Sequence, residues 1–284
     1  MSYTLMPLMP LCPYGHRRAQ ADYELQVTSL KMPIRKTEAI VLRSRDWSKS
    51  SRIVTFYTRL FGKVTGIAKG AKRPKNKFGS SLELFTTLTL IFYEKEGRGL
   101  QIISECALKE SFQEIRESLP GMAYASYLAE LVDRGVRGKE EAEGLFQLLL
   151  TAFHLLKKEV DPPLVARAFE LHLLRILGYQ PYLADCVSCR HKAEGKGLKF
   201  SPELGGILCF RCGDDRKEAL PISSGILPLM EQLDRMELTK LERLKVSNNL
   251  LEDLEALLRN YITFIYEKEL KSVKFLEQLN RAGR

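Results

Sequence analysis

Four cysteines lie close together in the sequence, in two pairs with the same internal spacing. Cys186 and Cys189 form one C-x2-C pair, and Cys209 and Cys212 form a second, with nineteen residues between the pairs. Each pair can form a tight turn that points two thiolates at one centre, so the two pairs supply the four tetrahedral sulfur ligands that Zn²⁺ prefers. We therefore expect one structural zinc ion here, because four thiolates leave no open position for the water of a catalytic zinc.

Other interpretations of these cysteines remain open. They could be four free thiols or two disulfides, and His191 could replace one of them as a ligand. A redox-active pair of the thioredoxin type would need a strand that leads into a helix, which this stretch does not suggest. The clustering favours metal binding in a reducing compartment over a disulfide framework.

A run of cations without acids lies in the N-terminal third of the chain. From Lys63 to Lys77 there are six cations and no carboxylate, and Gly70 and Pro74 within this run prevent a regular helix. Cations on such a loop can follow a phosphate backbone and release its counterions. The candidate DNA-binding residues are Arg43, Arg45, Lys63, Lys69, Lys72, Arg73, Lys75 and Lys77. The alternative is a solvated loop that binds no partner.

The distribution of charge along the chain favours the nucleic-acid interpretation. The net charge is +9, yet residues 32–110 carry 16 Lys and Arg against 7 Asp and Glu, while residues 213–284 carry 12 against 13. A local excess of this kind indicates a polyanionic partner, whereas a uniform excess would mainly affect solubility. No base-reading helix accompanies the basic run, so we expect binding with little sequence specificity.

Several aromatic residues accompany the cations. Proteins that bind single strands combine a basic groove with aromatic rings on which bases stack. Phe56 and Tyr57 lie within a predicted strand and are expected to be core or ordinary strand residues, whereas Trp47 and Phe78 lie in predicted loops, where a ring could be exposed or buried.

The elements that must position these residues divide the chain into a β part and a helical part. Five short segments rich in Val, Ile, Thr, Phe and Tyr are separated by turn residues, which fits a small closed barrel such as an OB-fold; another small β-sandwich is the alternative. The predicted strands are Thr37–Arg43, Ser51–Thr58, Lys63–Lys69, Leu84–Tyr93 and Leu100–Ala107. From residue 120 the apolar period becomes helical. The predicted helices are Gly121–Arg134, Glu140–Glu159, a segment between Asp161 and Gly178, Ser223–Arg235 and about Leu241–Leu270.

These observations predict an α+β chain: an N-terminal five-stranded OB-fold β-barrel, then an all-α domain with an inserted zinc ribbon whose ligands are the four cysteines. We expect an N-terminal extension at 1–31, an OB-fold DNA-binding domain at 32–110, and a helical domain at 111–284 with the ribbon at about 182–221.

The extension is either disordered or an over-long start ahead of Met32. Its basic pair follows the apolar stretch, the reverse of a secretory signal. No apolar run reaches the roughly 18 residues of a membrane span. We expect a cytoplasmic, nucleoid-associated protein that binds no membrane.

At this point the residues resemble a known family. The segments 38–44, 51–58 and 62–73 are similar to the N-terminal domain of the RecO family, and the segment 174–183 that leads into Cys186 is similar to its C-terminal part. The segment 200–212, which ends in Cys209 and Cys212, resembles the zinc-bearing branch of that family. The resemblance covers about 32–265 and does not extend to 1–31.

The resemblance implies a recombination mediator in DNA repair. It implies an N-terminal OB-fold, a helical C-terminal domain with a structural zinc, binding of single- and double-stranded DNA without sequence specificity, and annealing of complementary strands. It also implies action with RecR to load RecA on DNA coated by single-strand binding protein. Lys63, Lys69, Lys72 and Arg73 match the family's basic motif most closely.

Two other classes of function compete with a DNA-binding mediator. An enzyme such as a metal nuclease would need clustered carboxylates or histidines, but His16, His154, His172 and His191 are scattered. The pair Asp214-Asp215 fits a solvated turn better, and there is no phosphate-binding loop of the G-x4-G-K-[ST] type. We therefore expect no enzyme. The third class is a zinc-ribbon adaptor that binds proteins and makes no direct contact with DNA.

Overall fold

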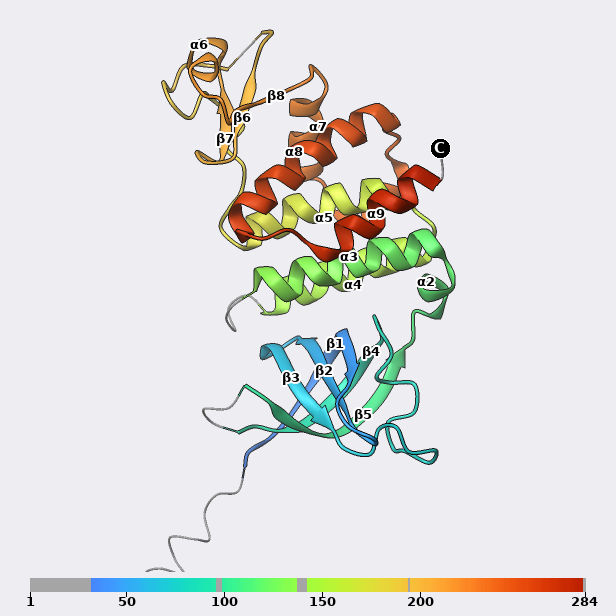
Figure 1. Cartoon of the computed structure of the whole chain (residues 1–284). Coiled ribbons are helices and arrows are strands. Elements are labelled where there is room, and N and C mark those ends of the chain that lie inside the picture. Colours follow the sequence, from blue (N-terminus) through green and yellow to red (C-terminus); the bar gives the residue numbers. More distant parts are fainter. Residues whose placement is uncertain (1–31, 96–98, 137–141, 194, 283–284) are drawn as a thin grey trace, which may run out of the picture.

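The computed structural model describes residues 32–95, 99–136, 142–193 and 195–282, so the predicted extension at 1–31 lies outside the described residues. The expected α+β architecture is confirmed: a β-barrel, a layered set of helices and a small cysteine-bearing unit follow one another from bottom to top in Figure 1. Among the described helices, none combines the length and the apolar character needed to cross a bilayer.

Five strands close into a barrel in the order β1-β2-β3-β5-β4, which is an OB-like arrangement. The strands are β1 (Ile34–Asp46), β2 (Arg52–Thr58), β3 (Gly62–Ala68), β4 (Thr87–Tyr93) and β5 (Gln101–Glu110). Neighbouring strands are antiparallel except β3 and β5, whose short parallel pairing completes the closure. A Cβ atom at Gly66 would lie 2.3 Å from the side chain of Ile103, so a larger residue here would have to displace that side chain.

The two faces of the strands serve two different cores. In β1, Ala39 and Val41 point into the barrel, while the alternate residues Ile40 and Leu42 belong to the core of the helical part. Helices α3 (Leu119–Gly135) and α4 (Ala142–Lys157) contact β1 and β2 from outside. The continuous run of buried residues in β1 therefore reflects burial on both faces of this strand.

The helical part lies in layers on one side of the barrel (Figure 1). Its elements are α2 (Gln113–Glu117), α3 (Leu119–Gly135), α4 (Ala142–Lys157), α5 (Pro162–Ile176), α7 (Ile226–Arg235), the 3-10 helix η1 (Leu238–Arg243), α8 (Asn248–Tyr266) and α9 (Lys271–Ala282). Helix α5 is central: it contacts α3, α4, α7, η1 and α8. Its Pro162 and Pro163 occupy the first turn, where a missing N–H costs no helical hydrogen bond.

The cysteine-bearing unit is inserted between α5 and α7. It contains β6 (Lys199–Ser201), β7 (Gly206–Leu208), the short helix α6 (Phe210–Asp214) and β8 (Leu220–Pro221), with sheet order β7-β6-β8. The antiparallel pair of β6 and β7 is the hairpin expected of a ribbon. Phe200 is fully buried and its ring packs edge-on against Tyr261 of α8, which fastens the ribbon to the helices.

One predicted element is wrong. The sequence pattern predicts a single helix over about Leu241–Leu270, but η1 ends at Arg243 and α8 begins at Asn248, after an extended Ser247. At the other end, Glu267 adopts a left-handed conformation (φ 54°) that ends α8 before α9. Ser247 and the two asparagines after it are residue types common at helix starts, although the Ser247 side chain makes no capping hydrogen bond.

Candidate metal centre and nucleic-acid interface

The four sulfur atoms of Cys186, Cys189, Cys209 and Cys212 lie within 4.8 Å of one another. The Sγ atoms of Cys189 and Cys209, one from each C-x2-C pair, are 3.8 Å apart. In a tetrahedral site with Zn–S bonds of about 2.3 Å the sulfur atoms are separated by about 3.8 Å. The donor set and its spacing therefore fit a metal ion that prefers four thiolates.

Backbone hydrogen bonds favour the thiolate form of Cys186, in the first C-x2-C pair. Cys186 is fully buried, and burial raises the pKa of its thiol; backbone N–H groups of Cys189, Cys209 and Ser188 donate to its sulfur and lower that pKa to about 6. Hydrogen bonds among the thiols act oppositely on Cys212, whose pKa rises to about 12 through its contacts with Cys209 and Cys189. Contacts within the cluster thus shift the pKa values of Cys186 and Cys212 in opposite directions.

The local fold explains how residues on either side of a nineteen-residue interval meet. The N–H of Cys186 donates to the carbonyl of His191, and the N–H of Val187 donates to the carbonyl of Ile207 in β7. The first pair is thereby held against the hairpin whose second strand leads directly into Cys209. His191 takes part through its backbone, and it is not among the clustered ligand atoms.

The basic run forms a turn-rich loop between β3 and β4. Within it Lys69, Arg73, Lys75 and Lys77 are exposed. Lys69, Arg73 and Lys75 make no ion pair with a carboxylate in the part of the chain that the structure describes. The ammonium group of Lys77 lies 5.4 Å from the centre of the Phe78 ring. These four cations keep their charge available to solvent or to a ligand.

Lys72 joins this loop to the turn between β1 and β2. Its N–H donates to the carbonyl of Ser50 over 3.0 Å, and its ammonium pairs with Asp46 at 2.5 Å. The ammonium bond and attraction of Lys72 lower the pKa of the Asp46 carboxyl below its usual value. Lys72 therefore has a structural role in addition to its charge, and it brings exposed Lys49 of the turn beside the basic loop.

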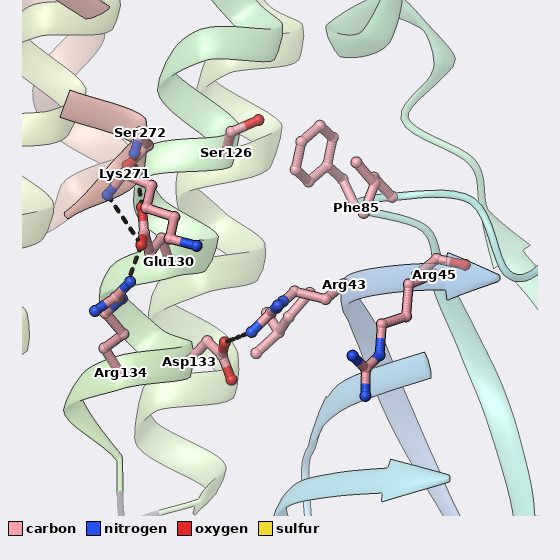
Figure 2. A pocket seen from close by; sticks show the side chains of 12 residues that line it. Arg43, Arg45, Phe85, Ser126, Glu130, Asp133, Arg134, Lys271 and Ser272 are labelled. Atoms are coloured by element: carbon pink, nitrogen blue, oxygen red, sulfur yellow. Dashed lines mark hydrogen bonds and ion pairs between the residues drawn. The ribbon is translucent and has the colours of Figure 1, made fainter. Parts of the chain in front are cut away.

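Two of the candidate cations, Arg43 and Lys63, form ion pairs with helix α3. Arg43 pairs with Asp133 of α3 at 3.1 Å, and the ammonium of Lys63 lies 3.5 Å from the other oxygen of the same carboxylate (Figure 2 shows the Arg43 pair). Lys63 also donates to the backbone carbonyl of Asp133. The structure therefore divides the predicted set, because these two cations join the barrel to the helices.

Arg45 occupies an intermediate position. It lines a cavity of about 370 Å³ between β1 and the helices α3 and α9, and it makes no ion pair among the described residues. Figure 2 draws an ion pair from Asp133 to Arg43 but none to Arg45. Arg134 and Lys271 line the same cavity, but Glu130 accepts from Arg134 and from the backbone N–H groups of Lys271 and Ser272.

The aromatic residues near the cations behave differently from one another. Phe56 and Tyr57 are fully buried, as expected for core residues, and Phe78 packs into the barrel core with 2% exposure. Trp47, in contrast, is 60% exposed on the β1–β2 turn.

Two residues that matter at the candidate interface were not predicted from the sequence: Lys49, an exposed cation of the turn, and Asp133, the partner of Arg43 and Lys63. Lys49 lies between the predicted strands Thr37–Arg43 and Ser51–Thr58, so its place in a connection could be seen in the pattern, whereas nothing local to Asp133 indicates its partners.

Comparison with known proteins gives a consistent result over most of the chain. Residues 32–112 match the family model described as "Recombination protein O N terminal", and residues 116–274 match "Recombination protein O C terminal". The chain is 37% identical over 254 residues to the DNA repair protein RecO of Symbiobacterium thermophilum, covering 88% of this chain and 100% of that protein. It is 37% identical over 252 residues to the DNA repair protein RecO of Desulforamulus reducens, covering 89% and 97%.

Proposed function

The chain belongs to the RecO family of DNA repair proteins, and from this premise we propose that it binds single- and double-stranded DNA through the exposed cations of its barrel. A role in DNA repair and recombination follows from the family itself. The proposal concerns how this chain fulfils that role: it holds the phosphate backbone of DNA without sequence specificity and brings complementary strands together.

One observation carries this proposal. Lys69, Arg73 and Lys75 are exposed on the same loop and have no carboxylate partner among the described residues, so no acid in that part of the chain neutralises their charge. Lys77 adds to the charge of the same loop, and Arg45 adds a cation on β1 that pairs with no carboxylate of the described chain. Lys72 contributes less because it pairs with Asp46, and Arg43 and Lys63 contribute less because Asp133 pairs with both. Binding to phosphates releases counterions from DNA, which supplies a favourable free energy that falls as salt rises.

The metal centre has a structural role in this proposal. Cys186, Cys189, Cys209 and Cys212 would hold one Zn²⁺ ion, and the ion would stabilise the ribbon, since its hairpin has only three residues in each strand. This is the one cluster of His, Cys, Asp or Glu able to hold a metal within the described ranges, and four thiolates leave no open coordination position. We therefore propose that the chain acts by binding and not as an enzyme.

The partners that we propose follow from the family. DNA and other repair proteins are implied directly, and within that group we propose RecR, single-strand binding protein and, indirectly, RecA. The domains at 32–110 and 111–284 would divide the work, the first binding DNA and the second carrying the ribbon and the contacts to proteins. Such a protein would act in the cytoplasm, at the nucleoid.

A salt titration tests the proposed interface. Affinity for a single-stranded oligonucleotide is measured between about 50 and 200 mM salt for the wild type and for a variant with Lys69, Arg73, Lys75 and Lys77 changed to alanine. We expect the slope of log K against log salt to become shallower by about 0.7 for each lost phosphate contact. The matched control changes four exposed cations outside the barrel, Lys217, Lys240, Lys245 and Lys268, to alanine.

Comparing the salt slopes of the two variants shows whether the loop or the general charge of the protein governs DNA binding. An equal change of slope in both variants would mean that general charge, and not this loop, governs binding. An unchanged slope in the loop variant would remove the loop from the site.

A second candidate is an adaptor that binds proteins and not DNA. It is favoured by apolar side chains exposed between the ribbon and α8, which line a cavity of about 790 Å³ and include Tyr179, Tyr182, Leu204 and Phe264. The two functions differ in a simple assay, because an adaptor of this kind would not bind naked DNA even at low salt.

A further inference from the structure

Trp47 lies in the short β1–β2 turn, which several hydrogen bonds hold in place. Its N–H donates to the carbonyl of Ser51 over 3.0 Å, and the hydroxyl of Ser48 accepts from the N–H groups of Ser50 and Ser51. The turn is also tied to the basic loop through Lys72. The backbone that carries the indole is therefore held by hydrogen bonds on both sides, so binding a ligand there requires little ordering of the chain.

The fold leaves most of the surface of Trp47 exposed. With 60% of its surface exposed, Trp47 contrasts with Phe78, the ring of the neighbouring loop, which is 2% exposed and packs into the barrel. A large flat ring on a fixed turn, with exposed Lys49 beside it, combines a stacking surface with positive charge. This is the combination that nucleic-acid binders use for unpaired bases.

We propose that Trp47 stacks on a base of single-stranded DNA whose phosphates lie along the loop from Lys69 to Lys77. The face of a base is free in a single strand, whereas in a duplex it is covered by the neighbouring base pairs. Trp47 therefore makes the site favour single strands, while the cations bind either form. This inference rests on the proposed function, because it requires that DNA lies on the basic loop.

Two substitutions at Trp47 test the inference by affinity. Wild type, Trp47→Ala and Trp47→Phe are compared on three ligands of equal length: a thymine single strand, an abasic single strand and a duplex. We expect Trp47→Ala to weaken binding of the thymine strand by about 5- to 150-fold, the range of one base–aromatic stack. Its affinities for the duplex and the abasic strand stay within about twofold of wild type. Trp47→Phe recovers most of the loss, because a phenyl ring also stacks.

Fluorescence provides a second readout that does not depend on a variant. Trp47 is the single tryptophan of the chain, so emission excited at wavelengths where tyrosine does not absorb reports on this side chain alone. We expect the thymine strand to quench this emission at saturation and the abasic strand to leave it nearly unchanged. Phe275→Ala, which removes an aromatic side chain that is 40% exposed on α9, is the matched control for affinity and should bind all three ligands as the wild type does.

The possible failures are distinguishable. If Trp47→Ala binds the thymine strand as well as the wild type does, or loses affinity for all three ligands equally, the stacking inference is overturned while DNA binding stands. If the wild-type protein binds none of the three ligands at low salt, the proposed function fails and the inference fails with it.

Discussion

At the scale of single residues, the least expected feature is a buried charged pair at the centre of the helical part. Arg167 and Glu170 of α5 are 2.7 Å apart, and their side chains are 2% and 0% exposed. Arg167 also pairs with Glu255 of α8 at 3.0 Å, and the hydroxyl of Tyr127 from α3 donates to Glu170. Burial raises the pKa of Glu170, although attraction to Arg167 acts in the opposite direction. The pair thereby connects three helices.

Removing one member of this pair should lower the free energy of unfolding substantially. Glu170→Ala leaves the guanidinium of Arg167 buried with less compensation, so we expect the free energy of unfolding to fall by about 3–5 kcal/mol in chemical denaturation. The control is Glu242→Ala, which breaks an exposed pair with Lys158 and should cost less than about 1 kcal/mol.

A double substitution distinguishes the loss of a partner from the loss of a favourable pair. Changing Arg167 to Met and Glu170 to Leu removes both charges, and we expect much of the stability to return. A double variant as unstable as Glu170→Ala would contradict this explanation.

At the scale of elements, a carboxylate of another helix caps the N-terminus of α9. Glu130 of α3 accepts from the backbone N–H groups of Lys271 and Ser272, and it also pairs with Arg134 (Figure 2). These are N–H groups of the first turn, which have no partner within their own helix. Burial raises the pKa of Glu130, but the bonds from Ser272 and Lys271 outweigh it and hold the pKa below its usual range.

The lowered pKa of Glu130 predicts a pH-dependent contribution to stability. A carboxyl whose pKa is lower in the folded state stabilises the fold above its unfolded pKa of about 4.3, and this contribution is lost as the pH falls through the folded pKa. Glu130→Ala should therefore cost about 1–2 kcal/mol at pH 7, and the difference from wild type should shrink below about pH 4. The control is exposed Glu237→Ala, for which the difference should not vary in this way; an equal pH dependence in both variants would argue against the capping role.

The ribbon is the element that depends most on a bound ion. We expect one zinc per chain in the reduced protein, and we expect the double substitution of Cys186 and Cys189 by alanine to abolish metal binding and to expose the ribbon to proteolysis. Cys106→Ala, which removes a buried thiol of the barrel, serves as control and should retain the metal. Elemental analysis and limited proteolysis measure the two effects; a metal-free wild type that resists proteolysis would contradict the structural role.

Much of this element order could be predicted from the sequence, for identifiable reasons. The strands are marked by β-branched residues and turn residues, and the ribbon by cysteine spacing, both of which are local signals. The break at Ser247 was missed, because an apolar helical period continues across it. The exposure of Trp47 and the burial of Phe78 could not be separated, since both residues lie in loops and only the packing of the closed barrel distinguishes them.

At the scale of the whole molecule, the barrel and the helices share cations as well as a core. Asp133 is distant in sequence from Arg43 and Lys63, yet it pairs with both across the junction. Sequence alone placed these two cations with the DNA-binding set, because their partner comes from another part of the fold. What remains for DNA is a narrower surface, formed by the loop from Lys69 to Lys77 and the neighbouring β1–β2 turn.

The central claim is that DNA lies on this loop, and protection of lysines from acetylation tests it most directly. The intact protein is treated with an acetylating reagent with and without a saturating single-stranded oligonucleotide, and each lysine is quantified by mass spectrometry. Our account predicts that Lys69, Lys75 and Lys77 are protected by DNA, whereas exposed Lys240, Lys245 and Lys268 react equally in both samples. Protection confined to the lysines of the helical part, with the loop lysines reacting as in free protein, would contradict it.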